Sequence, residues 1–132
     1  IYNLYMLTLK YCEDEKLKRA LAEEIFPGGR VDSAVVLYNG GEPCGLAEYA
    51  LKDGCVLIKK VGIVKGERKK GYGDFFTRAL IFKFVRSGLD ICVDCESKYF
   101  ENLGFTPDGR GGMRVSPDRV VFPSQCHRED KK

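Results

Sequence analysis

The stretch Arg68-Lys69-Lys70-Gly71-Tyr72-Gly73 separates two segments of different character. Residues 56–64 are apolar and rich in β-branched side chains, which predicts a strand, and residues 72–87 predict a helix. Glycines let successive backbone N–H groups converge on one point, and a helix N-terminus adds N–H donors and partial positive charge. With three cationic side chains beside it, this junction predicts a site for a phosphate-bearing ligand, most simply a pyrophosphate.

Two other glycine-rich signatures do not fit this loop. A P-loop for nucleoside triphosphates requires Gly-x4-Gly-Lys-Ser/Thr, but Tyr72 and Gly73 stand where the lysine and the hydroxyl residue must be. A dinucleotide fingerprint requires a third glycine three residues after Gly73, where the sequence has Phe76. What remains is Arg-x-x-Gly-x-Gly behind Val61-Gly62-Ile63. Taken alone, these residues are also compatible with a basic surface turn closed by glycines.

A second motif, Tyr99-Phe100-Glu101-Asn102-Leu103-Gly104-Phe105, lies downstream. Gly104 suits the left-handed position after a short helix, and Phe105 suits the core. Together the two motifs resemble the acyl-CoA-binding loop and the Phe-Tyr-Glu-x-x-Gly-Phe segment of the GCN5-related N-acetyltransferases, the GNAT superfamily. The resemblance covers roughly residues 31–115, and the glycine loop is its specific part.

The resemblance implies an α/β fold with a mixed, mostly antiparallel twisted sheet, a central splayed pair of parallel strands, and flanking helices. The splayed strands would be 55–64 and 89–94, with the pantetheine arm of acetyl-CoA held between them by backbone groups. The implied activity is transfer of acetyl from acetyl-CoA to a primary amine of a small molecule or peptide, by direct attack in a ternary complex. The implied cofactor-binding residues are Val61, Gly62, Ile63, Arg68, Lys69, Lys70, Gly71, Tyr72 and Gly73.

The catalytic residues are less clearly indicated by the sequence. The tyrosine that usually serves as acid in the family precedes the motif glutamate, and this chain has Phe100 there. Tyr99 is one residue earlier, about 100° around a helix, so it is the candidate acid only if the helix is rotated. Glu48 is the candidate base, with Asp94 and Glu96 as further carboxylates at the end of a central strand. Each of these carboxylates could equally be a solvated or capping group.

Two other classes of function remain open. The absent family tyrosine motivates a CoA-binding regulatory module without turnover. A nucleic-acid binder using the basic residues 65–70 is disfavoured, because the patch lacks the interleaved aromatics that base stacking needs and the net charge is only +3.

Composition fits a small enzyme domain. With 132 residues, 44% hydrophobic and 31% charged, we expect one domain over residues 1–122 and a polar tail over 123–132. No run of about 18 apolar residues is present, so we expect a cytoplasmic protein without a membrane partner, and a homodimer is possible. Six cysteines are expected to be reduced and mostly buried, and no metal site is predicted, because Cys92-Val-Asp-Cys95 lacks a second ligand pair in the right context.

The remaining pattern predicts the other elements. We expect strands at 3–10, 31–38, 42–51, 55–64, 89–94, 113–115 and 120–122, and helices at 14–26, 72–87 and 97–103. The first helix should bury one face, formed by Leu17, Ala20, Leu21 and Ile25. The aromatics of the 72–87 helix, Phe82 among them, are expected to be core residues.

Overall fold

The computed structural model describes residues 6–122. The strands are β1 (Leu7–Tyr11), β2 (Ser33–Asn39), β3 (Glu42–Lys52), β4 (Cys55–Ile63), β5 (Asp90–Val93), β6 (Thr106–Pro107) and β7 (Met113–Val115). The helices are α1 (Glu15–Ile25), α2 (Tyr72–Val85) and α3 (Lys98–Asn102), with short 3-10 turns η2 (Lys65–Glu67) and η3 (Pro117–Arg119).

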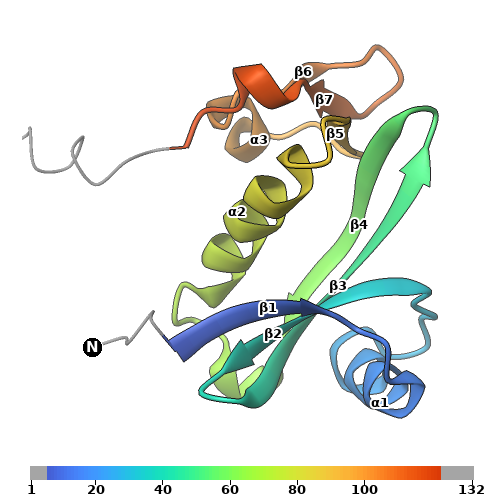
Figure 1. The fold of residues 1–132 in the computed structure, drawn as a ribbon, viewed down its shortest axis with the longest axis vertical. Helices are drawn as coiled ribbons and strands as arrows, with labels where there is room; N and C mark the ends of the chain where they lie inside the picture. The colour runs from blue at the N-terminus through green and yellow to red at the C-terminus, as the bar shows by residue number, and fades with distance from the viewer. Residues whose placement is uncertain (1–5, 123–132) are drawn as a thin grey trace, which may run out of the picture.

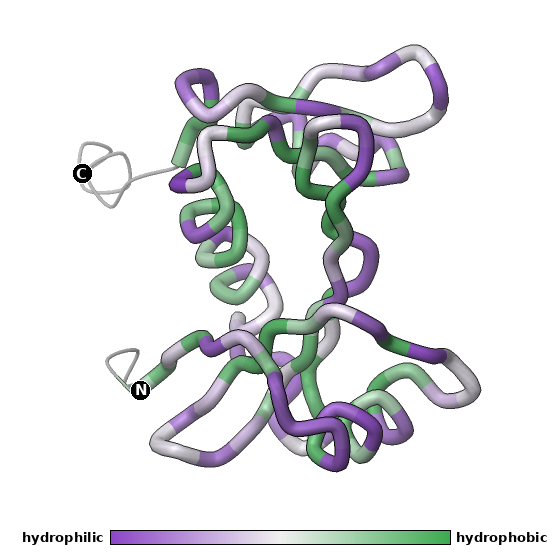
Figure 2. Tube along the Cα trace, turned by 45° about the vertical axis from the view of Figure 1, so that its right-hand side comes forward, coloured by the Kyte–Doolittle hydropathy of each residue, from purple (hydrophilic) through white to green (hydrophobic). Residues whose placement is uncertain are grey.

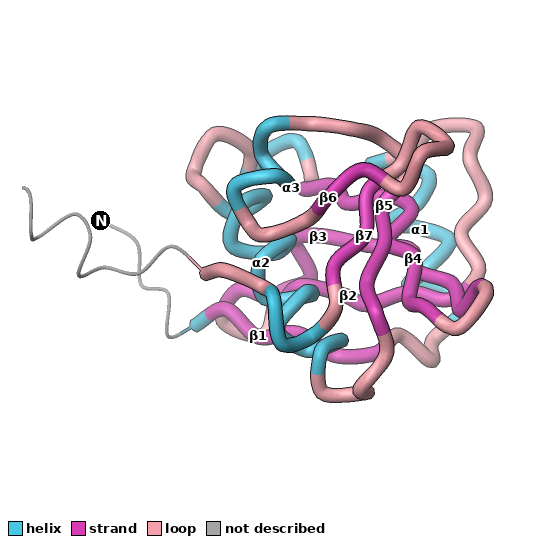
Figure 3. The backbone as a smooth tube through the Cα atoms, turned by 90° about the horizontal axis from the view of Figure 1, so that it is seen from above, coloured by secondary structure: helices cyan, strands magenta, loops and turns pink. Residues whose placement is uncertain are grey.

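One sheet organises the described part of the chain, with the strand order β1-β2-β3-β4-β5-β7-β6 (Figure 1). Every neighbouring pair is antiparallel except β4 and β5, which are parallel and are connected through α2. This mixed, mostly antiparallel sheet with a central parallel pair confirms the predicted fold class. Seen from above, β5, β7 and β6 lie side by side at one end of the sheet (Figure 3).

The two large helices cover opposite faces of the sheet, and β2 shows why. Val35 and Leu37 belong to the core beneath α2, whereas Val36 belongs to the core beneath α1. All three side chains have 0% exposure, so β2 is buried on both faces. Successive strand residues point to opposite faces, and an unbroken run of β-branched and leucine side chains therefore serves both helices. Hydrophobic residues follow the strands and α2, and hydrophilic ones gather in the turns (Figure 2).

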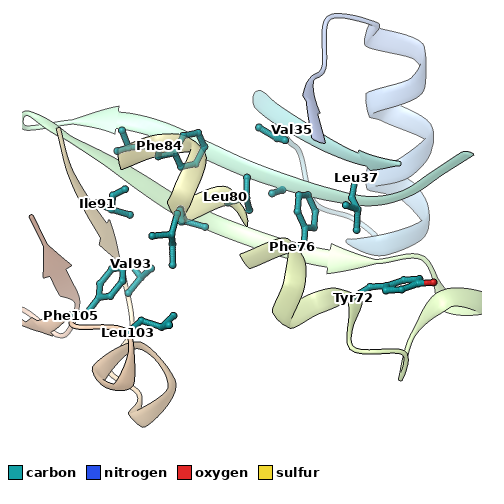
Figure 4. Close-up of a cluster of buried hydrophobic side chains, with 14 of the residues drawn as sticks. Val35, Leu37, Tyr72, Phe76, Leu80, Phe84, Ile91, Val93, Leu103 and Phe105 are labelled. Atoms are coloured by element: carbon teal, nitrogen blue, oxygen red, sulfur yellow. The ribbon is translucent and has the colours of Figure 1, made fainter. Parts of the chain in front are cut away.

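The core beneath α2 joins the two ends of the sheet. Phe76 and Leu80 of α2 lie between Val35 and Leu37 of β2 on one side and Ile91 of β5 on the other (Figure 4). The second motif enters the same core through Leu103 and Phe105, which are 2% and 1% exposed. Packing against α2 therefore keeps β4 and β5 in one layer beyond Ile58 and Val93, where the two strands are no longer hydrogen-bonded to each other.

Most predicted elements are confirmed, including the αL residue after α3. Gly104 has φ +100°, and an added Cβ would lie 2.3 Å from the Arg119 carbonyl oxygen, so this position needs glycine for both reasons. The first strand is described from Leu7 onward. Residues 3–5 of its predicted range and the predicted tail, 123–132, lie outside the described residues.

Three predictions about elements and burial are wrong. Residues 120–122 are not a strand: η3 precedes them, and a hydrogen bond from the Val121 N–H to the Leu103 carbonyl ties this segment to the end of α3. Ala20 is exposed and Ala22 is buried, because α1 is rotated so that it packs through Leu21, Ala22 and Ile25. Phe82 is 56% exposed on the outer side of α2, where its ring meets that of Phe122.

Gly62 of β4 is explained by packing rather than by backbone freedom. A Cβ on Gly62 would lie 2.2 Å from Cγ2 of Ile25 and 3.1 Å from the Phe26 ring, so the end of α1 sits directly on this glycine. We expect Gly62→Ala to lower the free energy of unfolding by about 1–3 kcal/mol, the usual cost of overpacking. Denaturant unfolding measures this change.

Gly73→Ala is the matched control for that substitution. A Cβ on Gly73, in the first turn of α2, meets nothing within 4 Å. Its stability should stay the same or rise slightly, since alanine is the better helix former. Equal stabilities of the two variants would contradict the assignment of Gly62 to helix packing.

Candidate functional site

The candidate site begins where the parallel pair comes apart. β4 and β5 are paired over four positions, from Cys55 with Asp90 to Ile58 with Val93. β4 then continues to Ile63, whereas β5 ends at Val93. Within residues 6–122, no strand pairs with residues 59–63 on the β5 side, and we call this stretch the open edge of β4. An unpaired strand edge presents backbone N–H and C=O groups that can bind an extended ligand as an added strand.

A β-bulge marks the same point on the other side of β4. Glu48 of β3 is opposite Lys60, but the next residue, Tyr49, is opposite Ile58, so Lys59 has no counterpart on β3. A bulge bends its strand and increases the local twist, which is one way to turn β4 away from β5. The separation of the two strands is therefore built into the β3–β4 register.

A cavity of about 350 Å³ occupies the gap between the separating strands. Its walls come from both strands and from the two helices that follow them: Ile58, Lys59, Lys60, Val61, Thr77, Val93, Asp94, Cys95 and Phe100. We call this cavity the cleft. Its lining places Val61 and Asp94, two residues that the sequence analysis singled out, in one site, and adds Lys60 and Thr77, which it missed. No sequence signal marked these two, since a strand lysine and a helical threonine are common on any surface.

The glycine loop, residues 68–73, lies at the end of the open edge. Gly71 is in the left-handed region, with φ +79°, and its carbonyl accepts the first hydrogen bond of α2, from the Phe75 N–H. Lys69 is also left-handed, with φ +69°. The left-handed conformations at Lys69 and Gly71 turn the loop sharply into α2. Gly71 and Gly73 are both exposed. The N–H groups of the first helical turn have no acceptor within the helix, and they can meet an anion that approaches this surface.

The cationic side chains of the loop do not all face a ligand. The Arg68 Nε donates a 2.9 Å hydrogen bond to the Ile63 carbonyl, so part of its guanidinium closes the loop onto the end of β4. The Lys70 ammonium lies 3.4 Å from the Glu67 carboxylate. The Tyr72 ring is buried in the core, where its hydroxyl accepts a hydrogen bond from the Asn39 amide. At Tyr72 the backbone, not the side chain, is therefore what the loop can offer to a ligand.

Glu48 is buried beside the cleft, on the face of the sheet that carries α1. It is 2% exposed, and its carboxylate accepts a 2.9 Å hydrogen bond from the Asp32 N–H. Its other oxygen lies 3.9 Å from the Lys60 ammonium, which also lies 5.4 Å from the Phe26 ring centroid. Glu48 does not line the cleft itself. Lys60, directly opposite Glu48 in the β3–β4 register, contacts Glu48 and also lines the cleft.

Phe100, not Tyr99, lines the cleft. The Phe100 ring packs edge-on against Tyr99 and at a tilt against Phe105 of the core. The Tyr99 hydroxyl donates a 2.5 Å hydrogen bond to the Asp74 carboxylate in the first turn of α2, close to Thr77 of the cleft wall. Burial, followed by this hydrogen bond and the charge of Asp74, raises the pKa of Tyr99 above its usual value near 10. The phenol therefore carries its proton at neutral pH.

The other candidate groups lie at the edges of the site or apart from it. Asp94 and Cys95 line the mouth of the cleft and are exposed, whereas Glu96 is exposed and does not line it. Among residues 6–122, no three His, Cys, Asp or Glu side chains come together in a way that could hold a metal ion. No helix in the described part of the chain is long and apolar enough to cross a membrane.

No protein-family model and no curated protein matches the sequence. The fold does match solved structures. A GNAT family acetyltransferase from Brucella melitensis in complex with acetyl-CoA aligns with a TM-score of 0.64 at 11% identity, over 90% of this chain and 93% of that one. The ribosomal-protein-S18-alanine N-acetyltransferase from Escherichia coli aligns with a TM-score of 0.62 at 15% identity, over 91% of this chain and 97% of the other.

A third similar structure is AtaT complexed with acetyl-methionyl-tRNAfMet, with a TM-score of 0.53 at 10% identity, over 85% of this chain and 95% of that one. At such low identities the likeness establishes the fold. The chain has the fold of the GNAT acetyltransferases, as the glycine loop and the Gly104 motif predicted.

The contact between Tyr99 and Asp74 can be tested by titration. We expect Asp74→Asn to lower the pKa of Tyr99, because the substitution removes a negative charge that opposes ionisation of the phenol. Since burial is the larger cause, the pKa should stay above the usual value. Absorbance at 295 nm against pH, compared with and without an added Tyr99→Phe substitution, isolates this tyrosine from the other six. An unchanged Tyr99 step in Asp74→Asn would show that the two side chains are not in contact.

Proposed function

We propose that this protein is an N-acetyltransferase that transfers the acetyl group of acetyl-CoA to a primary amine of a small molecule or peptide. The observation that carries the proposal is the open edge of β4, which leads from the cleft directly into the glycine loop. One continuous surface thus offers backbone groups for an extended chain and then a cationic, N–H-rich turn for a pyrophosphate. Residues 1–122 would act as one domain of this kind.

In this proposal the ligand lies along β4 in a defined direction. The pantetheine arm extends the sheet against the backbone of Val61, Gly62 and Ile63. The pyrophosphate binds the N–H groups of residues 69–73, with the Lys69 and Lys70 side chains and the remaining guanidinium nitrogens of Arg68 supplying charge. The thioester would then lie in the cleft, where the wall formed by Ile58, Val93 and Phe100 restricts water.

The acceptor amine would attack from the face of the sheet that carries α1. Glu48 is the buried carboxylate on that side, and we propose it as the base that accepts the proton of the amine. The ammonium of Lys60, beside Glu48 and in the wall of the cleft, keeps a positive charge near the carbonyl oxygen on which negative charge develops. Holding amine and thioester together in one ternary complex supplies the rest of the rate enhancement.

For the leaving thiolate we propose Tyr99 as the acid. Its hydroxyl lies between Asp74 and Thr77, and Thr77 belongs to the wall of the cleft. The Phe100 ring occupies the adjoining wall and carries no proton to give. Because Asp74 holds the Tyr99 proton, bound CoA would have to draw the phenol away from that carboxylate before transfer.

The second candidate function is a CoA-binding regulatory module without turnover, and Phe100 in the cleft wall favours it. Release of free CoA thiol in the presence of amines distinguishes the two. The acceptor panel should include small primary amines, peptides with a free N-terminus and an aminoacyl-tRNA, because the similar structures are named for a ribosomal-protein alanine and an acetyl-methionyl-tRNA. Binding of acetyl-CoA without thiol release on any of these would favour the regulatory module.

Acetyl-CoA binding should depend on Gly73. A side chain at this position has free space in the structure but would stand over the N–H groups that the pyrophosphate needs. We expect Gly73→Val to fold normally and to weaken acetyl-CoA binding at least about 100-fold, measured by calorimetry, the equivalent of roughly 3 kcal/mol.

Gly66→Val is the control for this experiment. Gly66 lies in η2 of the same connection, its added Cβ also meets nothing within 4 Å, and it is not part of the glycine loop. Its acetyl-CoA affinity should stay within a few-fold of the unmodified protein. Equal affinities of the two valine variants would contradict the proposed pyrophosphate site.

The proposed base and acid are tested by conservative substitutions. Glu48→Gln retains an oxygen for the Asp32 N–H but removes the base, and Tyr99→Phe retains the ring but removes the proton. Each should lower kcat by about 10²–10⁴-fold with little change in acetyl-CoA affinity. Normal turnover in either variant would remove that residue from the mechanism.

A further inference from the structure

Two cysteines meet across the parallel strand pair, within the stretch where β4 and β5 are still paired. The Cys55 Sγ of β4 lies 2.6 Å from the Cys92 Sγ of β5. In the register of the two strands Cys55 is opposite Asp90 and Cys92 is opposite Leu57, so the sulfurs meet along a diagonal. The separation is only slightly longer than a disulfide bond, which is about 2.05 Å. The two sulfur atoms are therefore already close enough to be joined.

The pair lies on the face of the sheet away from α2. Val56, which follows Cys55 along β4, and Ile91 and Val93, which flank Cys92 on β5, all pack in the core beneath α2. Alternation along each strand therefore places both thiols on the opposite face. Cys55 is 3% exposed, whereas Cys92 is only half-buried and is the sulfur that a small reagent can reach.

No other cysteines in the described part of the chain are placed in this way. Of the other three described thiols, Cys12 is half-buried, Cys44 is buried in β3 and Cys95 is exposed beyond β5. Cys126 lies outside the described residues. Within residues 6–122, Cys55 and Cys92 form the one sulfur–sulfur contact. The contact between Cys55 and Cys92 therefore reflects their positions in the fold, not simply the number of cysteines in the chain.

We propose that Cys55 and Cys92 are a dithiol that closes to an intrachain disulfide under a peroxide oxidant, tying β4 to β5 at the point where the cleft begins. The Cys92 thiol first loses its proton, and the thiolate attacks one oxygen of hydrogen peroxide. The O–O bond breaks, Cys92 becomes a sulfenic acid, and the departing hydroxide takes up the released proton to give the first water. The Cys55 sulfur then attacks the Cys92 sulfur, the S–O bond breaks, and the second water leaves with the Cys55 proton. Two electrons pass from the sulfur pair to the peroxide.

The bond would act on a short connection between two central strands of the sheet. Only four residue pairs join β4 to β5, and parallel pairing is the less stable kind. The disulfide would close a loop from residue 55 to residue 92 that contains the open edge, the glycine loop and all of α2. Cross-linking a loop of this length removes much of the freedom of the unfolded chain. The oxidised protein should therefore be more stable, with the apex of the cleft fixed.

The surroundings of the pair set the conditions for reaction. Burial, followed by the contact with Cys55, raises the pKa of Cys92 to about 12, against the opposing effect of the Arg114 and Lys52 charges. Only a small fraction of Cys92 is thiolate at neutral pH, so closure should be slow there and faster in mildly alkaline solution. The small thiolate fraction of Cys92 should therefore make the dithiol slow to oxidise at neutral pH.

The test uses the full chain carrying Cys12→Ser, Cys95→Ser and Cys126→Ser, which leaves Cys44, Cys55 and Cys92 as the remaining thiols. The protein is treated with hydrogen peroxide at pH 8.5, alkylated, digested and analysed by mass spectrometry. We expect a cross-linked pair of peptides containing Cys55 and Cys92, and an intact mass lower by two hydrogens. The melting temperature should rise by on the order of 10 °C and return to its starting value after reduction.

Substitutions in the same background separate the disulfide from other effects of peroxide. Cys92→Ser and Cys55→Ala should each abolish both the cross-link and the rise in melting temperature, and the pair of variants guards against one that fails to fold. Cys44→Ser should change neither, because this buried thiol contacts no other sulfur among residues 6–122. A cross-link that involves Cys44, a wild-type thiol count unchanged by peroxide, or an oxidised protein that melts no higher than the reduced one would overturn the proposal.

Discussion

The structure depends on a mismatch in length between two neighbouring strands. β4 runs from Cys55 to Ile63, but its parallel partner β5 ends opposite Ile58. Backbone groups in the middle of a sheet are normally satisfied by the next strand, and an unpaired edge is a liability that proteins cover or use. Here the edge opens into a cleft and ends at a glycine loop. The bulge at Lys59 and the short β5 create the candidate site. The side chains that line the cleft determine which chemistry is possible there.

Three packing features stabilise the sheet around the cleft, where β4 and β5 separate. α2 packs on both separated strands through a single core, in which Phe76, Leu80 and Ile81 are completely buried. The end of α1 rests on Gly62 from the other face. The Gly104 turn sends Phe105 into the core and leaves Phe100 against the cleft. Support therefore comes from packing, which leaves the backbone of the open edge available.

The sequence predicted the parts of the fold that are specified locally. The glycine loop and the Gly104 position follow from backbone conformations that only a few residue types adopt easily, so their positions were correct. The 120–122 strand was wrongly predicted because three β-favouring residues do not form a strand without a partner strand. Phe82 was wrongly assigned to the core. α2 has apolar residues on several sides, and the helical period does not show which of these sides packs on the sheet.

The site was predictable only in outline, because its details depend on contacts between distant segments. The rotation of α3 that brings Phe100 to the cleft and Tyr99 to Asp74 could not be derived from spacing alone. Gly62 was predicted to serve the ligand through its backbone, yet its lack of a side chain is required by α1. The contact between Cys55 and Cys92 depends on the register of two strands that are separated in the sequence by the whole of α2. The cysteine pattern indicated only that these thiols lie in strands.

The most direct measurement of the central claim is amide hydrogen exchange, residue by residue, with and without acetyl-CoA. If the open edge of β4 binds the ligand as an added strand, exchange should slow within residues 59–63 and within the glycine loop. Amides of β2 and of α1, which lie away from the edge, should be unaffected. Protection confined to other segments, or unchanged exchange along 59–63 under saturating acetyl-CoA, would contradict the account.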